Sequence, residues 1–305
     1  MAIGAAAAEA ITRREQVREG LYPYLLILPA MATLVAVALI PFLYTVTLSF
    51  RKMSFTTPGP FVGLENYARL LGDHLFWNTM SVTGLIIATA VPLEFLAGLG
   101  IALLLHQRIY GRPVLLPILF IPTILAPVVV AIIWKIMLAG SWGFLTYNVL
   151  DRFGLLQGTS VFSSPTWALV ALVLIDVWEW TPFMALGLFA GLQSLPVNPY
   201  VAAAVDGASP WQTFWRLTWS MLTPLMCVLV LLRMIDAFKI FDTVFLLTGG
   251  GPGVATETVS LYVYKRVFDF WDLGKASASA VIVFLLFFTF ANIFYQVAKR
   301  WLRAF

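Results

Sequence analysis

The chain has 305 residues, of which 61% are hydrophobic, 15% are aromatic and only 11% are charged. Soluble domains carry about 25% charged residues, so 19 basic and 15 acidic side chains could not cover the surface of a water-soluble particle of this size. The mean hydropathy of +0.90 indicates a polytopic membrane protein. The single cysteine, Cys227, excludes a disulfide within the chain, and no basic run indicates binding to nucleic acid.

Membrane-spanning helices are expected wherever about 20 mostly apolar residues follow one another, because that length crosses a bilayer core. Six segments satisfy this condition, at residues 21–50, 81–105, 113–138, 165–192, 221–247 and 276–298. The apolar stretch of the first segment is about twice as long as a signal-peptide core, which favours an uncleaved span. The sequence therefore predicts an all-α, polytopic protein with six transmembrane helices. Its membrane domain covers 21–298, between an N-terminal arm at 1–20 and a tail at 299–305.

The distribution of Lys and Arg predicts the orientation of the chain in the lipid bilayer. Six spans place both termini on one side, where the arm, the tail and two connections carry nine basic residues, against seven on the other side. Short cytoplasmic loops and tails carry the excess of basic residues in membrane proteins. Both termini are therefore expected in the cytoplasm.

The connection between the fourth and fifth spans, at about 195–224, is the longest on the predicted inner side. Two helix starts, each a capping residue followed by proline, flank a break: Asn198-Pro199, Asp206-Gly207 and Ser209-Pro210. Proline costs nothing at the first helical position, and glycine ends the helix before it. The sequence predicts two short helices that meet at a glycine bend, an elbow that either docks a soluble partner or lies on the lipid interface.

This elbow resembles the EAA loop of binding-protein-dependent ABC transporter permeases. The matching residues are Ala202, Ala203, Asp206, Gly207, Ala208 and Phe214. Val201 stands where that family usually has glutamate, and Trp219-Ser220 replaces its usual Leu-Pro. The resemblance implies that the elbow is a coupling helix in a groove of the ATPase subunit, and the valine argues against a salt bridge at that point.

Other segments resemble the maltose-type sugar permeases, in the same order along the chain. They are FVGLENY (61–67), WEWTPF (178–183), AGLQSLP (190–196), the charged stretch 233–242, LTGGGP (247–252) and GKASA (274–278). The resemblance implies the type I ABC importer permease fold, also called MetI-like or MalF-like, with cytoplasmic coupling helices and without a large outer domain.

Several ionisable residues lie in predicted spans, where charges are costly and usually face a polar interior or a partner. The fifth span carries alternating charges three residues apart, and the fourth carries two acids beside tryptophans. These residues are Asp176, Trp178, Glu179, Trp180, Arg233, Asp236, Lys239 and Asp242. Acids and aromatic rings suit the hydroxyls and C–H faces of a sugar, so the set is a candidate substrate pathway. A self-neutralising set of ion pairs that holds the helices together explains the charges equally well, and Glu94, alone in the second span, is a weaker candidate.

No Walker A sequence, metal cluster or catalytic motif is present in the sequence, so we expect no enzyme activity and no cofactor in this chain. The resemblance implies a membrane subunit of a sugar importer in the bacterial or archaeal cytoplasmic (inner) membrane, for a trehalose-type or maltose-type saccharide or a polyol. It also implies three kinds of partner: a second permease subunit in a heterodimer, two ABC ATPase subunits that bind ATP and Mg, and an extracytoplasmic sugar-binding protein or lipoprotein. The alternatives are a secondary transporter that uses the charged fifth helix as an ion relay, and an intramembrane enzyme that uses Asp176 and Glu179.

Overall fold

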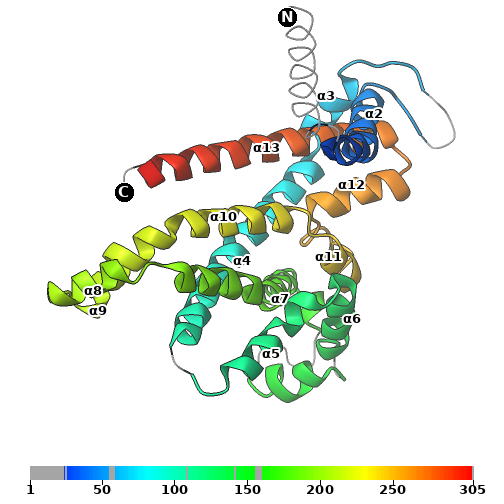
Figure 1. Cartoon of the computed structure of the whole chain (residues 1–305). Coiled ribbons are helices and arrows are strands. Elements are labelled where there is room, and N and C mark those ends of the chain that lie inside the picture. Colours follow the sequence, from blue (N-terminus) through cyan, green and yellow to red (C-terminus); the bar gives the residue numbers. More distant parts are fainter. Residues whose placement is uncertain are drawn as a thin grey trace, which may run out of the picture.

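The computed structural model describes residue 24 and residues 26–303 apart from 55–58, 108, 141 and 155–159, with side chains up to residue 300. The predicted N-terminal arm, at 1–20, and residues 304–305 of the tail lie outside the described residues. The helices in chain order are η1 (Val35–Leu39), α2 (Ile40–Ser49), α3 (Glu65–Leu71), α4 (His74–His106), α5 (Arg112–Ile124), α6 (Pro127–Met137), η2 (Thr146–Leu150), η3 (Val161–Ser163), α7 (Pro165–Ser194), α8 (Asn198–Val205), α9 (Pro210–Thr213), η4 (Phe214–Thr218), α10 (Trp219–Phe238), α11 (Asp242–Leu247), α12 (Val259–Phe268) and α13 (Leu273–Arg303). The expected all-α fold class is confirmed (Figure 1), since the one β pairing among described residues is an isolated bridge.

Five helices in the described part of the chain are long and apolar enough to cross a membrane: Leu26–Ser49, α4, α7, Pro210–Phe238 and α13. The predicted third span, 113–138, differs from expectation because it is broken into α5 and α6, which are bent by 91°. Ala126 is extended, with ψ of 136°, because the ring of Pro127 disfavours the helical conformation of the residue before it. The number of spans is six if this bent pair is one span.

The predicted fifth span, 221–247, also differs from expectation at its far end. α10 ends at Phe238, and the chain turns before α11 begins at Asp242. The prediction that four alternating charges lie on one helix is therefore wrong. Lys239 is the C-cap of α10, and Asp242 lies in the first turn of α11. The charged residues recur every three positions through the end of α10 and the start of α11. No proline or glycine marks this break in the sequence.

The centre of the molecule is formed by α4, α7 and α10. α4 packs along α7, and α10 contacts both helices. Gly98 permits the close approach of α4, because a Cβ atom there would lie 2.6 Å from the Cβ of Met184 on α7. Figure 1 shows α8 and α9 at one end of this bundle, and α11 and α12 at the other. We name these the elbow end and the loop end.

The segment FVGLENY has a structural role at the loop end. Asn66 is fully buried, and its Nδ2 donates to the backbone oxygens of Ser49 at 2.8 Å and of Arg51 at 2.9 Å. These bonds satisfy carbonyl groups at the end of α2 that have no partner within the helix. Gly274, at the start of α13, lies so close that an added Cβ would be 2.9 Å from Asn66 Nδ2. The two motifs therefore meet in space and join the first and last spans.

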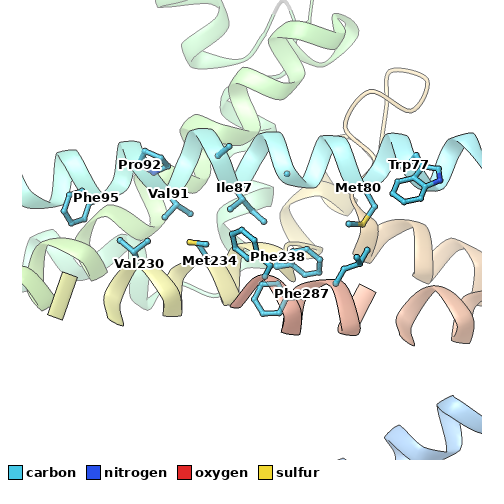
Figure 2. Close-up of a pocket in the computed structure, with 14 residues that line it drawn as sticks. Trp77, Met80, Ile87, Val91, Pro92, Phe95, Val230, Met234, Phe238 and Phe287 are labelled. Carbon is cyan, nitrogen blue, oxygen red and sulfur yellow. The ribbon is translucent and has the colours of Figure 1, made fainter. Parts of the chain in front are cut away.

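An apolar groove of about 750 Å³ lies between α4, α10 and α13. In Figure 2, Val91 and Ile87 of α4 face Met234 of α10, Phe287 of α13 lies beside Phe238, and Trp77 lies farther along α4. Among the described residues, no charged side chain lines the groove. Within a membrane-spanning bundle such a surface is covered by lipid or by another apolar helix.

Candidate functional site

The elbow has the expected glycine bend, but only α8 is a separate short helix, because the helix that begins with α9 continues from residue 210 to residue 238. Gly207 has φ of +70°, the left-handed conformation that glycine adopts without strain. α9 begins with a capping box, in which the Gln212 N–H donates to Ser209 Oγ at 3.3 Å and the Ser209 N–H donates to Gln212 Oε1 at 3.0 Å. The expected cap at the start of α8 is only partly confirmed. α8 begins at Asn198, but no side chain caps it with a hydrogen bond.

The elbow is joined rigidly to the fifth span. Residues 210–238 form a continuous helix, so that α9, η4 and α10 move together. The hydroxyls of Tyr200 on α8 and Thr218 in η4 are 2.9 Å apart and share a hydrogen bond. Phe214 packs edge-on against Trp215 at 5.2 Å and Trp219 at 6.2 Å between ring centroids. These contacts hold α8 and the aromatic cluster of η4 against the start of the fifth span.

One face of the elbow is apolar and exposed. Val197, Val201 and Val205, spaced four apart, are between 57% and 83% exposed, and Trp211 is 70% exposed. Residues four apart share one face of a helix. Of the six predicted coupling residues, Ala202, Asp206 and Gly207 are exposed, whereas Ala203, Ala208 and Phe214 are half-buried. An exposed apolar surface of this kind is typical of a binding site for a protein or for lipid.

A buried ion-pair network joins the three central helices. Arg233 of α10 is 1% exposed. Its guanidinium donates two hydrogen bonds to the carboxylate of Glu94 on α4, from Nε at 2.7 Å and from Nη2 at 3.0 Å. The same Nη2 donates to Asp176 Oδ2 of α7 at 2.5 Å, and Nη1 donates to Asp236 Oδ2 at 3.4 Å. Bidentate pairing of this kind fixes geometry as well as charge. The network therefore holds α4, α7 and α10 in register.

A polar cavity of about 140 Å³ adjoins this network. It lies where two spans are interrupted, since Pro127 at the break of the third span and Ile240 between α10 and α11 both line it. Irregular backbone at membrane depth is tolerated only where protein buries it or where it lines a polar cavity, and broken helices mark binding sites in transporters. The side chains that the sequence predicted and that line the cavity are Asp176, Glu179, Trp180, Arg233, Asp236, Lys239 and Asp242.

Trp178 is the one predicted pathway residue that the structure does not bring to this cavity. Its side chain is 40% exposed on another face of α7, and its ring lies edge-on to Trp134 at 5.5 Å. Trp180, by contrast, lies under the Arg233 guanidinium, 4.9 Å from its Cζ to the ring centroid. That distance is within the range of a cation–π contact.

Glu179 is the least compensated acid in the cavity. Glu179 is only 3% exposed. Its carboxylate makes no hydrogen bond or ion pair with any described residue. Its backbone oxygen accepts a bond from Thr123 Oγ1 at 2.6 Å, which links α7 to α5. An acid that lines a cavity and has no cation partner there is a candidate for a functional role.

Glu94 has a larger role than its isolated position in the second span indicates. It is fully buried and carries the bidentate half of the network. A lone acid in the middle of a span is itself a signal of an intramembrane partner. Its partner Arg233 lies 139 residues away in the sequence, so no local spacing could have paired them.

Comparison with known proteins agrees with this architecture. Residues 94–304 match the family described as binding-protein-dependent transport system inner membrane component. The chain is 36% identical over 290 residues to the trehalose/maltose transport system permease protein MalF of Thermococcus litoralis, covering 95% of this chain and 97% of that protein. It is 34% identical over 263 residues to the trehalose transport system permease protein SugA of Mycobacterium tuberculosis, covering 86% and 83%.

A solved structure supports the fold. The chain superposes with a TM-score of 0.78 on a chain of a bacterial ABC transporter involved in the import of the acidic polysaccharide alginate, covering 94% of this chain and 99% of that one at 20% identity. The chain therefore has the MetI-like importer permease fold that the sequence motifs implied. On the match of residues 94–304 and the identities over nearly the whole chain, the protein belongs to the family of inner-membrane components of binding-protein-dependent transport systems.

Proposed function

We propose that this chain is one of two permease subunits of an ATP-driven, binding-protein-dependent importer of a di- or oligosaccharide of the trehalose or maltose type. The observation that carries the proposal is its 36% identity to a trehalose/maltose permease over nearly the full length of both chains. The polar cavity and the elbow supply the two parts that such a subunit needs, a route for a polar solute and a contact for a motor.

In the proposed cycle the energy comes from ATP and Mg²⁺ bound by two partner ATPase subunits. The valine face of α8 and the tip at Gly207 dock into the ATPase from the cytoplasm, on the side of both chain termini. Because residues 210–238 form one helix, movement of the docked elbow tilts the fifth span. The bundle then alternates between inward-facing and outward-facing states, and an extracytoplasmic binding protein releases sugar into the outward-facing state.

The cavity is suited to a sugar by its chemistry. Carboxylates accept hydrogen bonds from hydroxyl groups, and the faces of Trp180 and Phe241, which both line the cavity, can stack on C–H surfaces. A volume of about 140 Å³ holds part of a disaccharide, so the second permease completes the route from its own side.

Transport in proteoliposomes tests this function. The permease pair is reconstituted with and without the ATPase subunits, and uptake of radiolabelled trehalose or maltose is measured with internal ATP. We expect uptake only when ATP, the ATPase and the binding protein are all present. Uptake that does not require ATP but depends on a proton gradient would favour the secondary transporter. Chemical conversion of the sugar without its uptake would favour the intramembrane enzyme.

Site-directed crosslinking tests the elbow separately. Cys227 is the only cysteine, so one substitution, Cys227→Ser, gives a cysteine-free background. Ala204→Cys places a thiol on the exposed tip of α8, and Asp269→Cys places a matched exposed thiol at the loop end. We expect Ala204→Cys, and not Asp269→Cys, to crosslink to the ATPase. Labelling of Ala204→Cys by lipid-phase reagents alone would contradict the docking role.

A further inference from the structure

The acids of the polar cavity outnumber its bases. Asp176, Glu179, Asp236 and Asp242 line it, against Arg233 and Lys239. Glu94, directly behind Arg233, adds a further carboxylate within hydrogen-bond distance of the guanidinium. By formal charge the residues around the cavity are therefore acidic, although the whole chain has a formal net charge of +4.

The strongest cation in the cavity is already saturated. Three of the guanidinium nitrogens of Arg233 donate to Glu94, Asp176 and Asp236. An entering anion would have to break one of these buried bonds to reach Arg233. Lys239 is held only by a 3.7 Å pair with Asp236 and is 69% exposed, so it offers a weakly held, hydrated charge.

Two carboxylates remain without a cation. Glu179 is 3% exposed and unpaired among the described residues while it lines the cavity. Asp242, at the start of α11, also makes no ion pair with a described residue. Both can accept hydrogen bonds from sugar hydroxyls, and in their ionised form both repel a carboxylate, sulfonate or phosphate on a ligand.

From this arrangement we infer that the cavity selects uncharged saccharides and excludes anionic ones, with Glu179 and Asp242 as the residues that set this selectivity. The inference rests on the proposed function, and it specifies the substrate class of that same cavity. The fold alone does not decide the question, because a chain of the same fold belongs to an importer of an acidic polysaccharide. Repulsion by one carboxylate at about 8 Å in a partly buried site corresponds to a loss of affinity on the order of tenfold or more.

The experiment measures binding to the purified complex without the binding protein, so that only the permease route is sampled. Trehalose and trehalose 6-phosphate, a neutral and an anionic form of one sugar, are titrated by calorimetry. We expect trehalose to bind at least about tenfold more tightly than its phosphate. Raising the salt concentration should strengthen binding of the phosphate and leave trehalose unchanged, because salt screens the repulsion.

Isosteric variants assign the effect to the two residues. Glu179→Gln combined with Asp242→Asn should raise the affinity for the phosphate relative to trehalose by at least about tenfold. Glu65→Gln, an exposed acid on α3 at the surface, should leave that ratio unchanged. If the two sugars bind equally, or if the double variant does not alter the ratio of their affinities, the inferred selectivity is wrong, while the proposed function is unaffected. Absence of binding by either sugar, together with absence of ATP-driven uptake, overturns the proposed function as well.

Discussion

Arg233 is the residue on which the packing of the three central helices most depends. It is the one cation among the described residues that contacts Glu94 and Asp176, both buried. Replacing a buried charge alone leaves its partners uncompensated, which costs about 3–5 kcal/mol, whereas neutralising the whole network can cost little. The network therefore specifies how α4, α7 and α10 fit together more than it adds net stability.

We predict that Arg233→Met lowers the thermal unfolding midpoint of the detergent-solubilised protein strongly, corresponding to about 3–5 kcal/mol. The triple variant Arg233→Met, Glu94→Gln, Asp176→Asn should recover much of that loss. Lys239→Met, which removes an exposed cation, should change stability by less than about 0.5 kcal/mol. A triple variant as unstable as Arg233→Met would contradict the network as its cause.

Asp73 has a comparable role at the loop end. Its carboxylate accepts bonds from Tyr262 Oη at 2.8 Å, Arg266 Nη2 at 3.1 Å and Lys275 Nζ at 2.5 Å, which connect the start of α4 to α12 and α13. Burial acts to raise the pKa of Asp73, but the hydrogen bonds and charge of Lys275, with the Tyr262 hydroxyl and the Leu75 N–H, lower this pKa from 3.8 to about 2.

The direction of the pH effect follows from this depressed pKa. Stabilisation by ionised Asp73 is fully present above pH 3.8 and is lost as the pH falls through about 2. We predict that Asp73→Asn destabilises the protein by about 2 kcal/mol at pH 6. Unfolding midpoints of the variant and the unaltered protein should converge as the pH approaches 2. Asp269→Asn, an exposed acid at the same end, should show no such difference, and a constant gap at every pH would argue against an ionised Asp73.

At the scale of the element, the elbow depends on one backbone conformation. Gly207 has φ of +70°, and an added Cβ would meet nothing within 4 Å. A side chain there costs about 1–2 kcal/mol from the left-handed backbone alone, without a clash. Substitution therefore changes the angle between α8 and α9 and leaves the membrane bundle intact.

Gly207→Val should uncouple ATP hydrolysis from transport in the reconstituted complex. We expect fewer sugars transported per ATP hydrolysed, with an unchanged unfolding midpoint of the bundle. Gly111→Val is the matched control, because Gly111 also has a left-handed φ, +85°, and open space around its Cβ, but lies outside the elbow. Full coupled uptake by Gly207→Val would contradict the docking role.

The elements also show how far local sequence signals reach. The elbow was predictable because capping residues, prolines and a glycine act over a few residues, and α4, α7 and α13 follow from apolar length. The end of α10 at Phe238 was not predictable, because no local signal marks it and the contact beside it is tertiary: Thr258 Oγ1 bonds to the backbone oxygen of Ile240 at 3.2 Å, from 18 residues away. The pairing of Glu94 with Arg233 was hidden for the same reason, whereas the acids around Trp180 were correctly grouped by helical spacing.

At the scale of the whole molecule, the apolar groove between α4, α10 and α13 is a surface that lipid or another apolar helix covers in a membrane. The groove is about 750 Å³ in volume and has no charged lining, so water is a poor occupant. In the proposed importer the second permease subunit fills this position, because two bundles must meet along apolar spans to enclose one route. Close packing of small residues and apolar side chains is what joins helices in a bilayer.

Two glycines of α4 allow a matched test of this contact. Gly84 lines the groove and Gly100 does not, and both are exposed with no atom within 4 Å of an added Cβ. Gly84→Trp should fill the groove and reduce copurification of the second permease by roughly tenfold, since overpacking of an interface costs about 1–3 kcal/mol. Gly100→Trp should leave assembly unchanged, and neither variant should lower the unfolding midpoint of the isolated chain. Intact assembly with Gly84→Trp, at the same yield as Gly100→Trp, would mean that lipid occupies the groove and that the two permeases meet elsewhere.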